Sequence, residues 1–359
     1  MQTAAGVILR PLEDRDFAAI ARIVSLTSGR PFGEAEMRDQ VREYEPERFD
    51  HGWLIAEHPD DGVVGYAWYH QIAWSFHPAK YAIRLAVHPD WQRRGIGRRL
   101  MDRVLDLLLG RGAQRIKANA REDWVRSIAF LRRYGFVERA RSFESRLQVA
   151  RCDLARFAGY ATRVAQAGIV LTTLEEELRR NPDCLPVLYQ LHCTLDVDAP
   201  RDDPEPPTPL TYETFLAISV RSPLALLDAY FLAKIGEMYV GESMLKRAAS
   251  DPGWLHQELT GVVSGFRGLG IATALKLRTI EYAQRGGYRE IQTRNSDRNA
   301  PMLAINAKLG FVRQPAWLEF QKESSHSGEQ GERCLSYGYS TYQRPRLRLG
   351  TITDGRPRI

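Results

Sequence analysis

Apolar residues change from strand spacing to helix spacing in the middle of the first half of the chain. From residue 81 to residue 87 they alternate with smaller or polar residues, which predicts a half-buried strand. Between residues 96 and 108 they recur at intervals of three and four, which predicts a helix that ends near Gly110. The pattern therefore predicts a strand, a short turn and a helix in succession.

The turn between these two elements has a glycine-rich sequence that recurs in the second half. Residues 92–97 read Gln-Arg-Arg-Gly-Ile-Gly, and residues 267–272, which lie 175 positions later, read Arg-Gly-Leu-Gly-Ile-Ala. A Gly-Phe pair follows each turn at the same interval of 43 residues, at 135–136 and at 310–311. Chance does not preserve such spacing, so the sequence predicts two similar domains.

Other predicted elements repeat around the turns. Short strands are expected at 7–11 and 169–173, a helix at 17–24, antiparallel hairpins at 62–74 and 229–245, and strands at 115–118 and 290–293. The first strands are 162 rather than 175 residues apart, so the second half gains about 13 residues, which we assign to an exposed Pro- and Asp-rich loop at 196–209. The predicted organisation is an N-terminal domain at 1–152, a helical linker at 153–167, a C-terminal domain at 168–334 and a basic tail at 335–359.

Composition narrows the class of protein. A chain of 359 residues with 44% hydrophobic and 26% charged residues is typical of a globular protein with two domains. The four cysteines have neither metal-ligand nor disulfide-framework spacing, so no metal site is predicted. We find no signal peptide and no membrane-spanning segment, and therefore expect a cytoplasmic protein.

The net charge of +6 is modest, and arginines are concentrated in the first glycine-rich turn. Nucleic acid could use such charge, but charge gathered at one point favours a small anion, so nucleic acid is not an expected partner. A glycine-rich turn between a strand and a helix presents unpaired backbone N–H groups at the positive end of the helix dipole, which is a phosphate-binding arrangement.

Two familiar phosphate-binding turns fit poorly. A nucleotide-binding P-loop needs Lys-Ser/Thr after its last glycine, where this chain has Arg98 and Ile271. A dinucleotide fingerprint needs a third glycine, where this chain has Leu100 and Thr273, although Glu290 lies where the acidic residue of that fingerprint would be expected.

Residues 87–97 and 260–272 resemble motif A of the GNAT acyltransferase superfamily, in which a Q/R-x-x-G-x-G/A turn holds the diphosphate of acetyl-CoA. Residues 299–311 are similar to motif B of the same family, Asn-x-x-x-x-x-x-Tyr-x-Lys-x-Gly-Phe. The resemblance covers nearly the whole chain in two copies, as in the tandem members of the superfamily. It implies an α/β (α+β) fold class with two tandem GNAT folds, each a mixed, mostly antiparallel twisted sheet flanked by helices.

The resemblance also implies the residues that contact acetyl-CoA, or another short acyl-CoA. In the first half these are Val87, Gln92, Arg93, Arg94, Gly95, Ile96, Gly97 and Arg98. In the second half they are Val262, Arg267, Gly268, Leu269, Gly270, Ile271, Ala272 and Asn299.

Superfamily members place a catalytic base on the strand before motif A, and only the second half offers one. There His256, Glu258, Thr260 and Val262 alternate and are expected to share one face, whereas the aligned residues at 81–87 are apolar. Glu258 is the candidate base, with His256 as partner or alternative. Its alternative role is a structural ion pair or a solvated charge.

Motif B shows the same asymmetry between the halves. Asn299 keeps the family asparagine, and Trp124 takes its place in the first half. Neither half has the motif B tyrosine that serves many relatives as general acid, because Leu131 and Asn306 occupy that position and Tyr134 lies three residues too late.

We therefore expect an acetyl-CoA-dependent N-acyltransferase, monomeric or homodimeric, that modifies a primary amine of a small molecule or peptide. The C-terminal domain would be catalytic and the N-terminal domain degenerate. A non-catalytic acyl-CoA sensor or binding module is the alternative.

Overall fold

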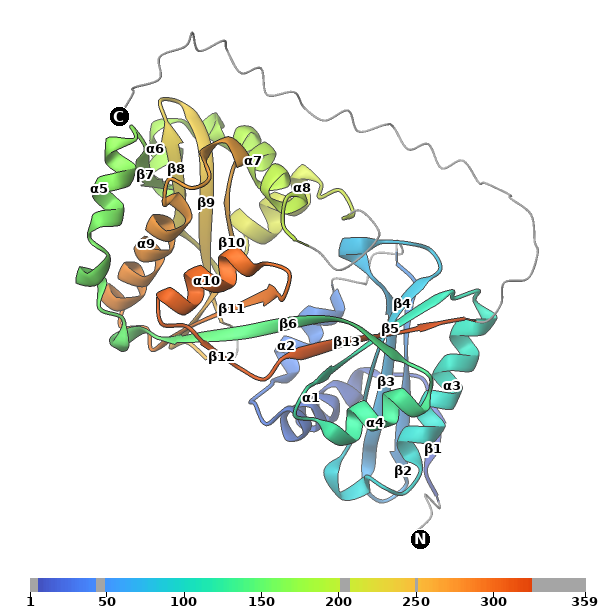
Figure 1. Ribbon diagram of the computed structural model, residues 1–359. Coiled ribbons are helices and arrows are strands. Elements are labelled where there is room, and N and C mark those ends of the chain that lie inside the picture. The colour runs from blue at the N-terminus through green and yellow to red at the C-terminus, as the bar shows by residue number, and fades with distance from the viewer. Residues whose placement is uncertain (1–5, 43–48, 201–206, 249–250, 325–359) are drawn as a thin grey trace, which may run out of the picture. The chain divides into compact units, whose positions relative to one another are not determined.

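The computed structural model describes residues 6–42, 49–200, 207–248 and 251–324, and Figure 1 shows its helices and strands. The predicted basic tail at 335–359 and part of the predicted loop at 196–209 lie outside these ranges. None of the described helices combines the length and the hydrophobicity that a membrane crossing requires.

In the first half the hairpin predicted at 62–74 is a single strand at 62–71. The first half otherwise contains the predicted elements in the predicted order, together with elements that were not predicted at 34–42, 51–58 and 137–148. They are β1 (Ile8–Arg10), α1 (Phe17–Ser28), α2 (Glu34–Arg42), β2 (His51–His58), β3 (Gly62–Gln71), β4 (Lys80–Val87), α3 (Ile96–Gly110), β5 (Arg115–Arg121), α4 (Val125–Arg133) and β6 (Val137–Gln148).

The second half repeats this order after a helix, α5 (Gly159–Gln166), within the predicted linker. Its elements are β7 (Val170–Thr173), α6 (Leu174–Arg180), α7 (Leu185–Val197), α8 (Tyr212–Phe215), β8 (Ala225–Ile235), β9 (Met238–Arg247), β10 (Trp254–Val262), α9 (Ile271–Arg285), β11 (Glu290–Ser296), α10 (Ala300–Lys308), β12 (Val312–Arg313) and β13 (Trp317–Glu323). Helix α7 reaches Val197, so it includes the first two residues of the loop predicted at 196–209.

Helices cover both faces of the sheet in each half, and their apolar residues explain why. In α3 the buried residues are those of the predicted stripe: Ile96, Leu100, Met101, Val104, Leu105 and Leu108. They form one core with the sheet of the first half, and α1 and α2 cover a second core on its other face. In the second half α9 covers one core, while α6, α7 and α8 cover the other.

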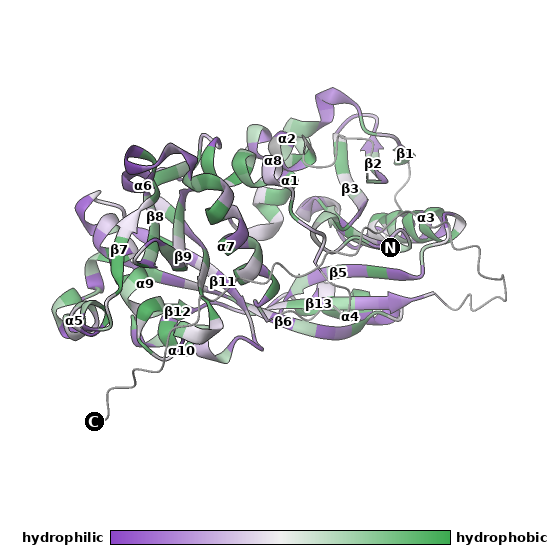
Figure 2. Cartoon of the chain, turned by 90° about the horizontal axis from the view of Figure 1, so that it is seen from above, coloured by the Kyte–Doolittle hydropathy of each residue, from purple (hydrophilic) through white to green (hydrophobic). Residues whose placement is uncertain are grey.

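The strands form one continuous, mostly antiparallel sheet in the order β1-β2-β3-β4-β5-β13-β6-β11-β10-β9-β8-β7, with β12 paired to β6. The predicted fold class is thereby confirmed. Strands β5 and β13 alternate between hydrophilic and hydrophobic residues along their length (Figure 2), as expected for strands in a sheet that packs against helices.

The two halves exchange their last strands. Strand β13, near the C-terminal end of the described chain, lies between β5 and β6 and pairs with both. Strand β6 belongs to the first half of the sequence, but its residues from Ser142 to Gln148 pair with β11 of the second half. Strand pairing therefore crosses the predicted domain boundary in four strand pairs, β5–β13, β13–β6, β6–β11 and β6–β12, a feature that the repeated motifs did not indicate.

The core residues follow the same exchange. Ala316, Leu318 and Phe320, from the end of the second half, are buried in the core beneath α3. Leu147 and Val149, from the end of the first half, are buried in the core beneath α9. Each half thus completes the hydrophobic core of the other.

In both halves the central parallel strands pair over only part of their length. Pairing of β4 with β5 runs from Lys80–Arg115 to Ile83–Ala118, and pairing of β10 with β11 runs from Trp254–Glu290 to His256–Gln292. Strands β4 and β10 continue beyond the last pair toward their glycine-rich turns. The sheet therefore opens beside each turn, and this opening positions the candidate site.

The strand exchange predicts that Phe320 stabilises the first half. Its side chain is fully buried beneath α3, so Phe320→Ala is expected to lower the free energy of unfolding by about 3–5 kcal/mol. Amide hydrogen exchange in β5, which pairs with β13, is expected to become faster. The control is Val312→Ala on β12, because Val312 is 64% exposed. Denaturant unfolding that is unchanged by Phe320→Ala would contradict the exchange.

Candidate active site

The two glycine-rich turns have the same backbone conformation. Gly95 and Gly270 precede α3 and α9 with positive φ angles of 90° and 85°. Two residues earlier, Gly268 has φ 82° and Arg93 has φ 67°. Arg93 is the one non-glycine residue with positive φ among those described. The first half therefore keeps the shape of the turn even where a side chain makes it unfavourable.

The turns present backbone N–H groups as expected for an anion site. The helical hydrogen bonds begin with Arg99 N to Gly95 O and Ala274 N to Gly270 O, so the three preceding N–H groups of each helix have no helical partner. The positive end of the helix dipole lies at the same place. Both turns thus have the backbone geometry that phosphate binding requires.

Side chains connect each turn to the strand before it. Gln92 donates from Nε2 to the Val87 carbonyl at 3.1 Å, and Arg267 donates from Nε to the Val262 carbonyl at 3.0 Å. Arg267 also forms an ion pair with Asp198 at 2.9 Å. Gln92 and Arg267 were both predicted from the motif. In each half this side chain connects the turn to the last carbonyl of the preceding strand.

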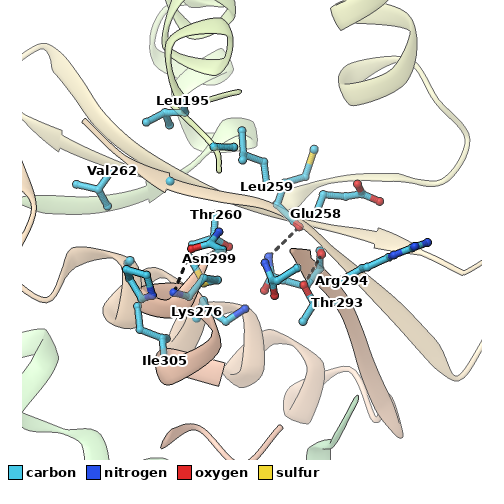
Figure 3. Close-up of a pocket in the computed structure, with 18 of the residues that line it drawn as sticks. Leu195, Glu258, Leu259, Thr260, Val262, Lys276, Thr293, Arg294, Asn299 and Ile305 are labelled. Carbon is cyan, nitrogen blue, oxygen red and sulfur yellow. Dashed lines mark hydrogen bonds between the residues drawn. The ribbon is translucent and has the colours of Figure 1, made fainter. Parts of the chain in front are cut away.

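A cavity of about 1240 Å³ lies beside the second turn. Figure 3 shows part of its lining on β10, α9, β11 and α10. Most of the predicted second-half residues line it, namely His256, Glu258, Val262, Arg267, Gly268, Gly270, Ile271, Ala272 and Asn299. Leu269 is not among the lining residues and is 38% exposed. The first half contributes Arg30, Gln40 and Glu144 to the lining.

The predicted first-half residues lie elsewhere. None of the residues from Val87 to Arg98 belongs to the lining of this cavity. Arg94 stacks over the Trp91 ring at 4.5 Å, and Arg98 is an exposed partner of Asp102 at 3.7 Å. Beside the first turn, Leu85 and Phe130 approach Gly97 and occupy space near the end of β4.

The prediction that the alternating residues from His256 to Val262 share one face of β10 is wrong beyond Glu258. Pairing with β9 shifts between Gln257 and Thr260, which marks a β-bulge. Thr260 contacts Ser243 at 2.8 Å, Ser243 accepts from Gln257 at 3.1 Å, and Gln257 accepts from Thr279 of α9 at 2.8 Å. Thr260 therefore faces α9.

Val262 also faces α9, since it belongs to the core beneath that helix. His256 and Glu258, which alternate with Gln257, lie on the opposite face of the sheet, and Figure 3 shows Glu258 and Thr260 on different sides of the strand. The bulge thus separates the two candidate catalytic residues from the two residues predicted to share their face.

The environments of the two candidate catalytic residues differ. Glu258 is exposed to the cavity and has no hydrogen bond or ion pair with any described residue. Burial lowers the pKa of His256 below its usual value, although the nearby Glu258 and Glu144 carboxylates oppose this shift. His256 is therefore neutral at physiological pH, and the Glu258 side chain has no partner among the described residues.

Helix α5 supplies site residues that the motifs did not reveal. Tyr160 lies against the second turn, where a Cβ on Gly270 would come within 3.0 Å of its ring. Lys308 donates to the Tyr160 hydroxyl at 2.6 Å. Arg163, one turn further along α5, also lines the cavity. The linker helix thus adds an aromatic ring and a cation beside the phosphate-binding turn.

A buried lysine is the second feature that sequence reasoning missed. Lys276 on α9 is 1% exposed, lines the cavity and lies 4.9 Å from the centre of the Phe311 ring. It has no ion-pair partner among the described residues, and burial lowers its pKa to about 7. Comparison of the two repeats could have revealed this lysine, because the equivalent first-half residue is the buried Met101.

A histidine on the other wall also has a defined orientation. His192 of α7 hydrogen bonds through Nδ1 to Glu242 at 2.8 Å, and Tyr230 donates to the same carboxylate at 2.5 Å. Burial disfavours the charged imidazole, but the Glu242 carboxylate favours it more, and the pKa of His192 is raised. Two elements far apart in sequence form this arrangement, so no local motif predicts it.

The motif B residues have structural roles as well. Asn299 caps α10, accepting from the Met302 N–H at 3.3 Å. Asn306, in the position of the family tyrosine, is buried and donates to Asn295 at 2.8 Å, while its own Oδ1 has no partner. In the first half Trp124 forms no such cap and packs edge-on against Trp317.

Comparison with known proteins agrees with this geometry. Residues 17–136 match the model of the acetyltransferase (GNAT) family. No curated protein matches the chain. The family match falls on the first half, whereas the large cavity lies in the second.

Solved structures match across both halves. A tandem GNAT protein from the clavulanic acid biosynthesis pathway has a TM-score of 0.67 at 20% identity, over 90% of this chain and 100% of that chain. A GCN5-related N-acetyltransferase from Sphaerobacter thermophilus has a TM-score of 0.64 at 17% identity, over 89% and 96%. A putative acetyltransferase from Pyrococcus horikoshii has a TM-score of 0.51 at 16% identity, over 90% and 92%.

The first half is thus a GNAT acetyltransferase domain, and the fold of the whole chain is that of a tandem GNAT protein.

The buried amine predicts a pH-dependent stability. Because the pKa of Lys276 is about 7 when folded and about 10.4 when unfolded, the unfolded chain binds more protons between these values, and stability rises with pH there. Lys276→Met is expected to remove this rise and to increase the free energy of unfolding at pH 7 by at least about 2 kcal/mol. Urea unfolding at several pH values measures both effects. Lys308→Met, at an exposed position of α10, is the control. A wild-type slope that Lys276→Met leaves unchanged would exclude a buried neutral amine.

Proposed function

We propose that the protein transfers an acetyl group from acetyl-CoA to a primary amine and that the second half carries out the reaction. The observation that carries this proposal is the cavity, which extends from the second glycine-rich turn to Glu258 at the opening between β10 and β11. The family match supports acetyl transfer, and the cavity supports the choice of half.

The residues present suit acetyl-CoA. The N–H groups at the start of α9 would hold its diphosphate, with Arg163 and Arg267 nearby to balance charge. Beyond His256, the edge of β10 no longer pairs with β11 and can hydrogen bond to the amides of the coenzyme arm. Acetyl-CoA supplies the thioester that the amine attacks.

Glu258 is the residue we assign to proton removal. Its carboxylate accepts a proton from the incoming ammonium, and the neutral amine forms the new C–N bond. The C–S bond breaks, and the coenzyme thiolate takes up the second proton from the amine nitrogen and leaves as the thiol. His256 is the alternative acceptor, since it is neutral and lines the same cavity. Asn306 cannot act as the acid, because it is an amide held by Asn295.

The coenzyme site predicts a difference between the two turns. Gly270→Ala would add a Cβ at a positive φ and within 3.0 Å of Tyr160, so it is expected to weaken acetyl-CoA binding at least about tenfold. Gly95→Ala at the equivalent first-half position is expected to have little effect, as is Gly265→Ala, which adds its Cβ in open space. Titration calorimetry measures the affinities. Weaker binding in Gly95→Ala but not Gly270→Ala would move the site to the first half.

The proposed role of Glu258 as the base predicts an effect on turnover and not on coenzyme binding. Glu258→Gln keeps the size of the side chain but removes the proton acceptor, so kcat is expected to fall about 10²- to 10⁴-fold while the acetyl-CoA affinity is unchanged. Glu237→Gln is the matched control, because the Glu237 side chain is 97% exposed on the β8–β9 turn. Release of the coenzyme thiol with a panel of amines measures turnover. Full activity in Glu258→Gln would reject this base, and binding without thiol release in wild-type protein would favour the non-catalytic acyl-CoA module.

A further inference from the structure

Glu258 and Arg294 occupy matching positions on two neighbouring strands. The last paired residues of β10 and β11 are His256 and Gln292, and Glu258 and Arg294 each follow two positions later. Side chains two positions apart in a strand share a face. Glu258 and Arg294 therefore start from the same face of the sheet at the mouth of its opening, and both line the cavity. Figure 3 shows their positions on the two strands.

Arg294 is held in place but keeps its charge unpaired. Its Nε donates to Ser142 at 2.8 Å, and its guanidinium lies 5.6 Å from the centre of the Trp317 ring. No carboxylate among the described residues forms an ion pair with it. The surrounding protein lowers the pKa of Arg294 by desolvation, yet the side chain remains exposed to the cavity.

The nearest acids cannot supply that partner, because other bases already hold them. Glu144, directly opposite Arg294 on β6, accepts from Arg30 at 2.6 Å and from Arg146 at 2.7 Å. Glu319 pairs with Lys117 at 2.7 Å. A guanidinium that a hydrogen bond and an aromatic ring hold at the wall of a cavity, without an ion-pair partner among the described residues, can bind a planar carboxylate.

A free anion lies beside this free cation. Glu258 has no partner among the described residues, and the gap between the two strands keeps it from pairing directly with Arg294. A cation and an anion that line one cavity without partners among the described residues can each pair with an oppositely charged group of a ligand. The two residues together fit a ligand that carries both an ammonium and an anionic group.

We propose that the acceptor is an amino acid, with its carboxylate on Arg294 and its amine directed to Glu258. This inference rests on the proposed acetyl transfer and adds the class of substrate. The amine reaches the proposed base because the carboxylate fixes the other end of the molecule. An amine without a carboxylate lacks this second contact and is a poor acceptor.

The test compares matched acceptors. The protein amino acids, β-alanine and 4-aminobutyrate are assayed at saturating acetyl-CoA beside their carboxamides, their decarboxylated amines and the corresponding aminophosphonates. We expect the best amino acid to exceed its carboxamide at least about tenfold in kcat/KM. Arg294→Gln is expected to reduce this ratio to about twofold by raising the KM for the amino acid. Arg278→Gln, in an exposed ion pair of α9, is the control.

The outcomes separate this proposal from the proposed function. Equal use of amino acids and carboxamides would overturn the carboxylate site while acetyl transfer stands, and a preference for aminophosphonates would replace the carboxylate with a phosphate-like group. If no acceptor releases thiol, acetyl transfer fails. Titration calorimetry then tests the carboxylate site without turnover. The proposal is supported if an amino acid binds the wild-type protein and Arg294→Gln abolishes this binding. It is overturned if no member of the panel binds.

Discussion

The end of pairing between β10 and β11 is the constraint on which the site depends. Two parallel strands that stop pairing after His256 and Gln292 leave backbone groups without sheet partners and open the sheet beside the start of α9. A continuous sheet would close the cavity and place Glu258 opposite Arg294 at normal strand spacing, where an internal ion pair would neutralise both. The opening thus creates the space for a coenzyme and leaves the charges available to a ligand.

The two halves share this backbone plan and differ in what fills the opening. Where the second half has Thr260, Lys276 and Ile305 lining the cavity, the equivalent positions of the first half have Leu85, Met101 and Phe130 in or against the hydrophobic core. Three larger or more apolar side chains convert a ligand site into a packed core without altering the turn. The positive φ at Arg93 shows that the first turn keeps this shape with a non-glycine residue at that position.

The repeated motifs were sufficient to predict the two folds and the glycine-rich turns, because each depends on residues close together in sequence. Most of the second-half motif residues line the cavity. The β-bulge in β10 could not be predicted, since it arises from pairing with β9 and not from the alternation of His256 to Val262. The same limit applies to the strand exchange and to the His192–Glu242 pair, which join segments 50 or more positions apart. Lys276 was accessible to sequence reasoning through comparison with Met101, because a lysine in an otherwise apolar helix stripe is unusual.

The strand exchange gives the first half a role even if it binds no coenzyme. Strand β6 carries Glu144 to the position opposite Arg294, and Arg30, which follows α1, forms an ion pair with that acid. Trp317, at the start of β13, contacts Arg294 while its strand completes the first sheet. The first half is therefore a structural part of the cavity wall beside Arg294, because it supplies both Glu144 and its partner Arg30.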